Sequence, residues 1–167
     1  PTPSSAASDV YKRQVEGGPI DVLTGDYLAE LTMTILYNQK IKRGEDHGYV
    51  GTFLKQFKDV AKSTQEKNIK IVYNSGGLNP KAIALEVEKI IDELNLKLKV
   101  AYIEGDDLIP EFQKLSEAGE KFKNLDNEIN LSDYPKKPIT ANAYLGAWGI
   151  KEALENGADV VICPRVT

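Results

Sequence analysis

The hydrophobic and polar positions of this chain follow two patterns, short apolar runs and longer stretches with helical spacing. The apolar runs, short enough for buried strands, cover residues 20–23, 69–73, 98–103 and 158–163. Apolar residues that recur every three or four positions, as on one face of a helix, occupy residues 27–37, 49–66, 80–94 and 144–156. Apolar strands that alternate with helices are typical of a parallel sheet. We therefore predict an α/β fold, with a mostly parallel sheet and helices on both faces.

Helix-terminal residues support these boundaries. Asn79 followed by Pro80 predicts a helix start, with asparagine as the cap and proline at the first position. Gly157 is expected to end the last helix. A short helix is predicted at residues 110–117, and the polar stretch at residues 120–137 predicts an exposed insertion.

The first residues differ in character from the rest. Residues 4–14 (SSAASDVYKRQ) can be back-translated in frame into a transposase-type sequencing adapter. The simpler alternative is a flexible N-terminal tail. We predict a non-native, disordered head at residues 1–14, with no fixed contacts, and a fragment of a single α/β domain at residues 15–167. The final apolar run has no helix after it, so we expect the fragment to be cut at both ends.

Composition excludes several classes of protein. Of the 167 residues, 41% are hydrophobic and 28% are charged, which is typical of a globular domain. Acidic and basic residues are interspersed at a net charge of -4, so nucleic acid is not an expected partner. The sequence has no apolar run of membrane-spanning length and no signal-peptide pattern, which favours a cytoplasmic location without membrane association. The single cysteine excludes an internal disulfide.

Candidate chemistry lies in the loops that follow the apolar runs, because ligands of open α/β sheets bind where strand carboxyl ends meet helix starts. The catalytic candidates are the strand-end carboxylates Asp26, Glu104 and Asp106, and Glu30 lies one turn beyond Asp26. The predicted ligand-binding residues are Gly25, Asn74, Gly76, Gly77, Asn79, Asp107, Tyr144 and Arg165. No metal site is predicted, since the paired carboxylates lack a third ligand, and the sequence indicates no particular cofactor.

Each motif also has a structural interpretation. Gly76 and Gly77 could cradle an anion at a helix start or merely permit a tight turn. Asp106 and Asp107 could hold a general base or cap a helix. Cys163, far in sequence from the only histidine, is better explained as a buried structural residue than as a nucleophile. Trp148 and Tyr144 are expected to pack in the core, although Tyr144 at a helix start could contact ligand.

Several blocks, taken together and in order, resemble the acyclic terpene utilisation family. They are residues 17–33 (GGPIDVLTGDYLAELTM), 74–80 (NSGGLNP), 104–108 (EGDDL), 140–150 (TANAYLGAWGI) and 157–161 (GADVV). The resemblance makes Asn142 a further ligand-binding candidate beside Tyr144. It transfers no catalytic residue. One departure is Cys163-Pro164, where the family pattern leads us to expect Thr-Gly before Arg165.

The resemblance implies a role in bacterial catabolism of acyclic terpenes such as citronellol and geraniol, or of branched acyl-CoA compounds. Two hypotheses follow. The chain is part of an enzyme that acts on a branched acyl-CoA or related carboxylate, or it is a non-catalytic acyl-ligand binding or assembly subunit of an acyl-CoA carboxylase pathway. The expected partner is a small molecule, an acyl-CoA or a carboxylate. A second copy of the chain or a carboxylase-pathway protein remains open as a macromolecular partner.

Overall fold

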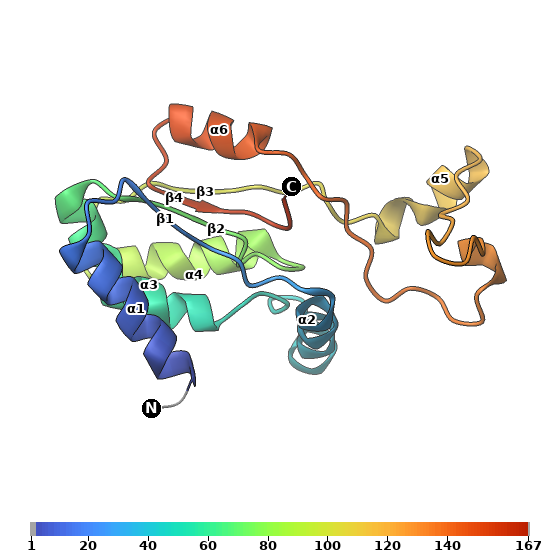
Figure 1. Cartoon of the computed structure of the whole chain (residues 1–167), viewed down its shortest axis with the longest axis horizontal. Coiled ribbons are helices and arrows are strands. Elements are labelled where there is room, and N and C mark those ends of the chain that lie inside the picture. Colours follow the sequence, from blue (N-terminus) through green and yellow to red (C-terminus); the bar gives the residue numbers. More distant parts are fainter. Residues whose placement is uncertain (1–2, 167) are drawn as a thin grey trace.

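The computed structural model describes residues 3–166, with side chains from residue 10 onward. Its centre is a four-stranded sheet in the order β1-β2-β4-β3 (Figure 1). The strands are β1 (Val22–Gly25), β2 (Lys70–Tyr73), β3 (Val100–Tyr102) and β4 (Val160–Ile162). Every neighbouring pair is parallel, with Leu23 opposite Ile71 and with Ile71 and Val100 both opposite Val160. The predicted parallel α/β fold is confirmed.

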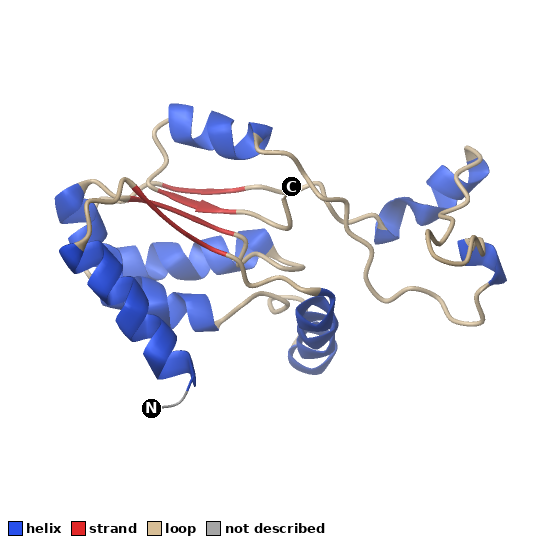
Figure 2. Cartoon of the chain, in the orientation of Figure 1, coloured by secondary structure: helices blue, strands red, loops and turns tan. Residues whose placement is uncertain are grey.

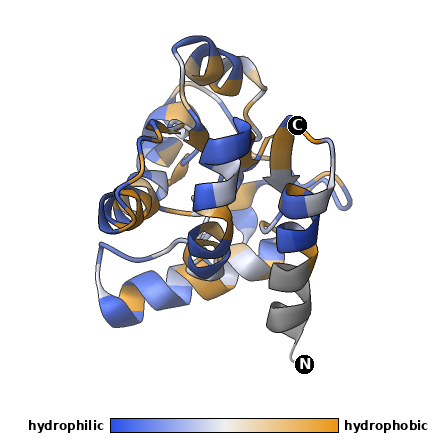
Figure 3. Cartoon of the chain, turned by 90° about the vertical axis from the view of Figure 1, so that its left-hand side faces the viewer, coloured by the Kyte–Doolittle hydropathy of each residue, from blue (hydrophilic) through white to orange (hydrophobic). Residues whose placement is uncertain are grey.

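Helices lie on both faces of the sheet (Figures 1 and 2). Two of them, α3 (Thr52–Lys67) and α4 (Pro80–Glu93), pack below it, and α6 (Trp148–Glu155) lies above β3 and β4. The cover is unequal, because Val22 on edge strand β1 is 46% exposed whereas all of β4 is buried. In Figure 3 the helices alternate between hydrophobic and hydrophilic segments, as amphipathic helices around a sheet do.

The core lies between the sheet and the α3–α4 layer. Phe53 and Phe57 of α3, with Ile83 and Val87 of α4, are almost fully buried against Ile71 and Val160 of the sheet. Burying one such side chain contributes about 1.5–3 kcal/mol. The predicted start of α4 is confirmed, since the Asn79 Oδ1 accepts a hydrogen bond from the Ala82 N–H at 3.1 Å and Pro80 occupies the first position.

At the amino edge of the sheet, Asp159 joins three strands. One carboxylate oxygen lies 2.7 Å from the Lys70 Nζ at the start of β2. The other accepts a hydrogen bond from the Lys99 N–H, just before β3, at 2.8 Å. Both oxygens of Asp159 are therefore bonded within the fold, and this edge is held together structurally.

Two predicted helices have different boundaries. The first, α2 (Glu30–Arg43), starts three residues later than predicted, because the Tyr27 N–H is bonded to the Asn74 Oδ1 at 2.7 Å and residues 26–29 form a loop. It buries Met33 and Leu36 and leaves Leu31 71% exposed. Likewise α6 begins at Trp148, because Leu145 pairs with Val166 in an isolated bridge. Trp148 is 81% exposed, so its predicted place in the core is wrong.

The insertion predicted after β3 forms an arm, residues 106–143, which projects from the body of the molecule (Figure 1). It carries the 3-10 turn η1 (Ile109–Glu111), the short helix α5 (Phe112–Glu117) and the 3-10 turn η2 (Leu131–Asp133). Its two limbs meet at the base through a bridge between Asp107 and Asn142. None of residues 107–143 is buried.

The N-terminal head departs from the expectation of disorder. Helix α1 (Pro3–Gly17) packs beside α3, and Val15 is fully buried. The Tyr11 ring meets the Tyr73 ring edge-on, with 6.0 Å between centroids. The expectation of no fixed contacts is thus wrong for the described residues, because apolar residues at helical spacing give this segment a face that packs against the core. The foreign origin of the head stays a prediction.

Replacing Tyr11 with alanine tests the packing of α1. Tyr11 lies in a small hollow with Leu23, Phe53 and Tyr73. The hollow is shielded from water, since burial raises the pKa of Tyr73 far above its ordinary value. We expect Tyr11→Ala to lower the free energy of unfolding in urea by about 1–2 kcal/mol. The control is Val10→Ala, because Val10 is 51% exposed. Equal stability of the two variants would contradict a packed α1.

Candidate functional site

The loop after β1 is tied to the loop after β2. The Asn74 side chain donates from Nδ2 to the Asp26 Oδ1 at 2.5 Å, and its Oδ1 accepts from the Tyr27 N–H at 2.7 Å. The same Asp26 oxygen accepts from the Leu28 N–H at 3.1 Å. The structure thus brings Asp26 and Asn74 together. Gly25 is the last residue of β1, and the Tyr73 ring fills the place where a Cβ would stand. Ligand binding by Gly25 stays a prediction.

The second cluster joins Glu30, Tyr144 and Arg165, which come from three separate segments. The Arg165 Nη2 donates to the Glu30 Oε1 at 2.5 Å, and the Tyr144 hydroxyl lies 3.4 Å from the same oxygen. The Arg165 guanidinium carbon lies 4.3 Å from the centre of the Tyr144 ring, a cation–π contact. The hydrogen bond from Arg165, helped by its charge, lowers the pKa of Glu30 below its ordinary value.

Burial differs sharply within this ion pair. The Arg165 side chain is 13% exposed, whereas the Glu30 side chain is 83% exposed. The Arg165 Nε is buried and has no hydrogen-bond partner within the described residues. The guanidinium is therefore largely covered by the protein, while its carboxylate partner lies mostly in solvent.

The third cluster lies at the base of the arm. Asn142 donates from Nδ2 to the Asp106 Oδ2 at 2.7 Å, and the Ala143 N–H donates to the Asp106 carbonyl oxygen at 2.8 Å. Asp106 is 4% exposed, and burial raises its pKa, against the lowering effect of the Asn142 hydrogen bond. The Asp107 carboxylate accepts a hydrogen bond from the Ile109 N–H at 3.0 Å. This bond closes the turn before η1, but the cap position of η1 is Leu108 and no side chain caps it, so the capping role left open above is wrong. Glu104 is exposed and makes no side-chain hydrogen bond or ion pair within the described residues.

The glycine loop after β2 is packed into the fold. Gly76 and Gly77 are buried, and the Gly76 N–H donates to the Cys163 carbonyl oxygen at 3.3 Å. Asn79 has both ends of its amide engaged, since it caps α4 and donates from Nδ2 to the Glu45 carbonyl oxygen at 2.8 Å. These contacts favour the structural interpretation of the motif. Ligand binding by Gly76, Gly77 and Asn79 stays a prediction without geometric support.

Cys163 and Pro164 are buried at the end of β4. Burial raises the pKa of the Cys163 thiol to about 11, so the thiol is protonated near neutral pH and is a poor nucleophile. Its backbone N–H donates to the Tyr73 carbonyl oxygen at 2.9 Å. These observations agree with the structural role expected for this cysteine.

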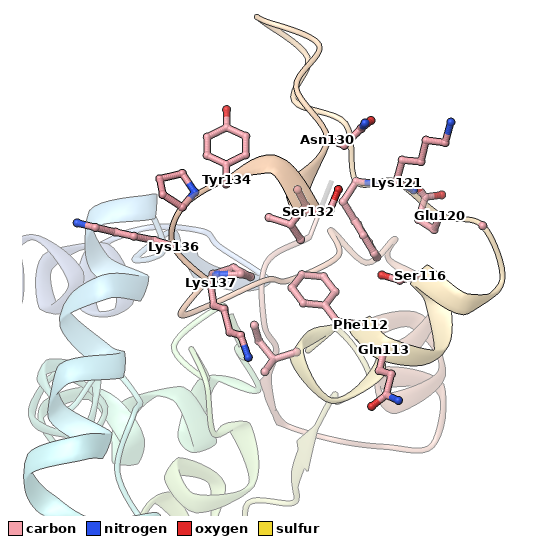
Figure 4. A pocket seen from close by; sticks show the side chains of 16 residues that line it. Phe112, Gln113, Ser116, Glu120, Lys121, Asn130, Ser132, Tyr134, Lys136 and Lys137 are labelled. Atoms are coloured by element: carbon pink, nitrogen blue, oxygen red, sulfur yellow. Dashed lines mark hydrogen bonds between the residues drawn. The ribbon is translucent and has the colours of Figure 1, made fainter.

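A hollow that the sequence did not predict lies in the arm (Figure 4). Its volume is about 920 Å³, and residues 109–138 supply its walls, among them Phe112, Phe122, Leu131 and Tyr134. The sequence of this segment contains aromatic residues interspersed with lysines, which could have indicated the hollow. The segment was interpreted as an exposed insertion because most of its residues are polar. The described strand-end clusters contribute nothing to its lining.

The described residues also bear on metals and membranes. Among them, no group of three or more histidine, cysteine, aspartate or glutamate side chains is placed to hold a metal ion. In the same part of the chain, no helix is both long and apolar enough to cross a bilayer.

Comparison with known proteins places the chain in a family. A family model described as "Acyclic terpene utilisation family protein AtuA" matches residues 5–167. The chain belongs to the acyclic terpene utilisation family. No curated protein and no solved structure matches it. Membership links the chain to acyclic terpene utilisation.

The structure shows where this member's departure from the expected family pattern falls. Cys163 and Pro164 stand where Thr-Gly was expected, and both are buried. Arg165 follows them directly and still reaches Glu30. Cys163 and Pro164 therefore belong to the packing beneath the loop, and the contacts of Arg165 are made by its own side chain.

Replacing Gly77 with alanine tests the packed loop. Gly77 has φ +56°, and an added Cβ would lie 2.7 Å from the Gly48 carbonyl oxygen and would collide with Leu36. We expect Gly77→Ala to lower the free energy of unfolding by about 1–3 kcal/mol, through strain and overpacking. Gly51→Ala is the matched control, because φ there is −61° and an added Cβ meets nothing. Full stability of Gly77→Ala in urea denaturation would show that the loop is open.

The raised pKa of Asp106 predicts a pH-dependent stability. A raised pKa favours the protonated carboxyl in the folded state, so the stabilising contribution is complete below the ordinary value of 3.8 and is lost as pH rises through the raised pKa. Asp106→Asn does not titrate and retains an acceptor for Asn142. Its free energy of unfolding relative to wild type should therefore increase from about pH 3 to about pH 7. Urea denaturation across this range measures it, with exposed Asp126→Asn as control; a constant difference would refute the effect.

Proposed function

We propose that this chain binds the anionic end of a branched acyclic acyl compound, a carboxylate or an acyl-CoA, at the carboxyl edge of its sheet during catabolism of acyclic terpenes or branched acyl-CoA compounds. Arg165 is the anion-binding residue. When no ligand is present, the Glu30 carboxylate occupies the place of the ligand's anionic group. Family membership supports the substrate class. The geometry of the Arg165 cluster supports the site.

The observation that carries this proposal is the asymmetry of the Arg165–Glu30 ion pair. Arg165 is held by the buried loop after β4 and by the Tyr144 ring, so the guanidinium is positioned before any ligand arrives. Glu30 is in solvent, and releasing it to water costs little. A ligand carboxylate or phosphate can therefore take over its hydrogen bond to Arg165, as guanidinium groups favour.

Exposed apolar side chains on the segments around this cluster suit a branched hydrocarbon chain. Leu31 follows Glu30 directly and is 71% exposed, and Trp148 lies shortly after Tyr144. Tyr102, at the end of β3, is also exposed. Leu31 and Trp148 thus lie on the segments that carry Glu30 and Tyr144, and contiguous exposed apolar surface is typical of ligand-binding sites.

The alternative of a non-catalytic acyl-ligand binding or assembly subunit has an observation in its favour. A general base works best with a pKa near the operating pH, and Arg165 shifts the pKa of Glu30 in the opposite direction. Asp106 has a raised pKa, but it is buried and bonded to Asn142. Catalytic roles for Asp26, Glu104 and Asp106 stay predictions, and binding is the role that the cluster supports best.

Opposite effects of two substitutions test the site. The probes in isothermal titration calorimetry are citronellate and geranate, the carboxylates that correspond to citronellol and geraniol after oxidation of the alcohol group. We expect Arg165→Gln to weaken binding by about tenfold or more, through loss of a charge-assisted hydrogen bond. Glu30→Gln should strengthen binding, because it removes the carboxylate that competes for Arg165.

The control is Glu86→Gln, which breaks the ion pair with Lys89 on α4 and should leave affinity unchanged. Circular dichroism checks that each variant is folded. Weaker binding after Glu30→Gln would show that Glu30 supports the site and does not compete for it. Equal binding by wild type and Arg165→Gln would remove Arg165 from the site.

A further inference from the structure

The hollow in the arm has an aromatic floor and incomplete cover. The rings of Phe112 and Phe122 pack with centroids 4.6 Å apart at 60°. Leu131 and Tyr134 extend the apolar wall. None of residues 107–143 is buried, so the arm has no hydrophobic core and these apolar side chains remain partly exposed to water. Apolar surface held in this state gains free energy when another apolar group covers it.

Three lysines line the hollow, and none of them forms an ion pair within the described residues. They are Lys121, Lys136 and Lys137. In Figure 4, Lys136 and Lys137 lie on one side of the Phe112 ring and Lys121 on the other. Two arm lysines that do not line the hollow are paired, Lys114 with Glu111 at 3.5 Å and Lys123 with Glu128 at 3.1 Å.

The one carboxylate that lines the hollow, that of Glu120, accepts hydrogen bonds from backbone N–H groups. Glu120 accepts hydrogen bonds from the Lys121 N–H at 2.9 Å and from the Phe122 N–H at 3.0 Å. It fixes the turn in which Phe122 adopts φ +45°. The carboxylate therefore holds the aromatic floor in place and forms no ion pair with the lysines.

We infer that this hollow binds a soluble amphipathic carboxylate, with its apolar chain over Phe112 and Phe122 and its anionic head at Lys136 and Lys137. A volume of about 920 Å³ suits this class of ligand, since small-molecule sites usually span about 300–1,000 Å³. The site is separate from the Arg165 cluster and does not depend on the function proposed for it. It gives the arm a role of its own in collecting or presenting amphipathic anions.

The test uses matched ligands and matched lysine pairs. Isothermal titration calorimetry with decanoate, below its micelle concentration, should show binding to the wild-type chain, and decyltrimethylammonium should not bind. The double variant Lys136→Gln with Lys137→Gln should weaken decanoate binding by about tenfold or more. The control double variant, Lys114→Gln with Lys123→Gln, removes the same charge from the arm and should leave affinity unchanged.

Arg165→Gln separates this site from the strand edge. If decanoate affinity falls with Arg165→Gln and not with the Lys136 and Lys137 variant, the carboxylate binds at the strand edge and the inference is overturned. Equal binding of the cationic analogue, or an equal loss in the control variant, would also overturn it. A further outcome would overturn the inference: analytical ultracentrifugation shows a dimer, and this dimer does not bind decanoate. A second copy of the chain would then cover the hollow.

Discussion

The fold depends on strand β4, which is fully buried and pairs on both sides. Val160 lies opposite Ile71 of β2 and Val100 of β3, although these partners are far apart in the sequence. Without β4 the sheet would separate into the β1–β2 pair and an isolated β3. The position of β4 also decides where Arg165 emerges, between the loops of β2 and β3. From this central place its side chain reaches Glu30, which follows the distant edge strand β1.

The two edges of the sheet use charged residues differently. At the amino edge, Asp159 is bonded through both oxygens and holds three strands in register. At the carboxyl edge, Arg165 is partly buried and bonded to a solvent-exposed partner, and its buried Nε has no hydrogen-bond partner within the described residues. Buried charges are costly unless they are fully paired. An incompletely satisfied guanidinium at the edge where α/β sheets bind ligands supports the proposed role of Arg165 in binding, whereas the contacts of Asp159 are structural.

The sequence predicted the features that depend on local pattern. The parallel strands and the Asn79-Pro80 helix start follow from apolar runs and from capping chemistry, which short windows of sequence contain. The errors come from long-range contacts. The Tyr27 N–H is bonded to Asn74, and Leu145 pairs with Val166 in a bridge, so neither helix starts where its periodicity indicated. Trp148 lies in solvent because α6 covers only part of its face of the sheet.

The candidate site shows the same division. Asp26 and Asn74 are brought together as strand-end residues should be. Asn142, which no strand precedes and which only the family resemblance suggested, bonds to Asp106 across the base of the arm. Gly76 and Gly77 suggested an anion cradle, but their contacts with Pro80 and Leu36 cannot be deduced from a glycine pair alone. The asymmetric exposure of Glu30 and Arg165 is also invisible in sequence, since it depends on which side chains cover each group.

Charge at the carboxyl edge favours exchange of one anion for another over simple addition. Asp26, Glu30, Glu104 and Asp107 are exposed there, and Arg165 is the cation that the structure places among them. An additional anion would meet repulsion from these carboxylates, and solvent would screen it only partly. A ligand that displaces Glu30 keeps the charge beside Arg165 constant and sends the displaced carboxylate into water, where it is already 83% exposed. Under the proposed function, the exposed ion pair therefore sets the affinity for the ligand, because the ligand must displace the Glu30 carboxylate from Arg165.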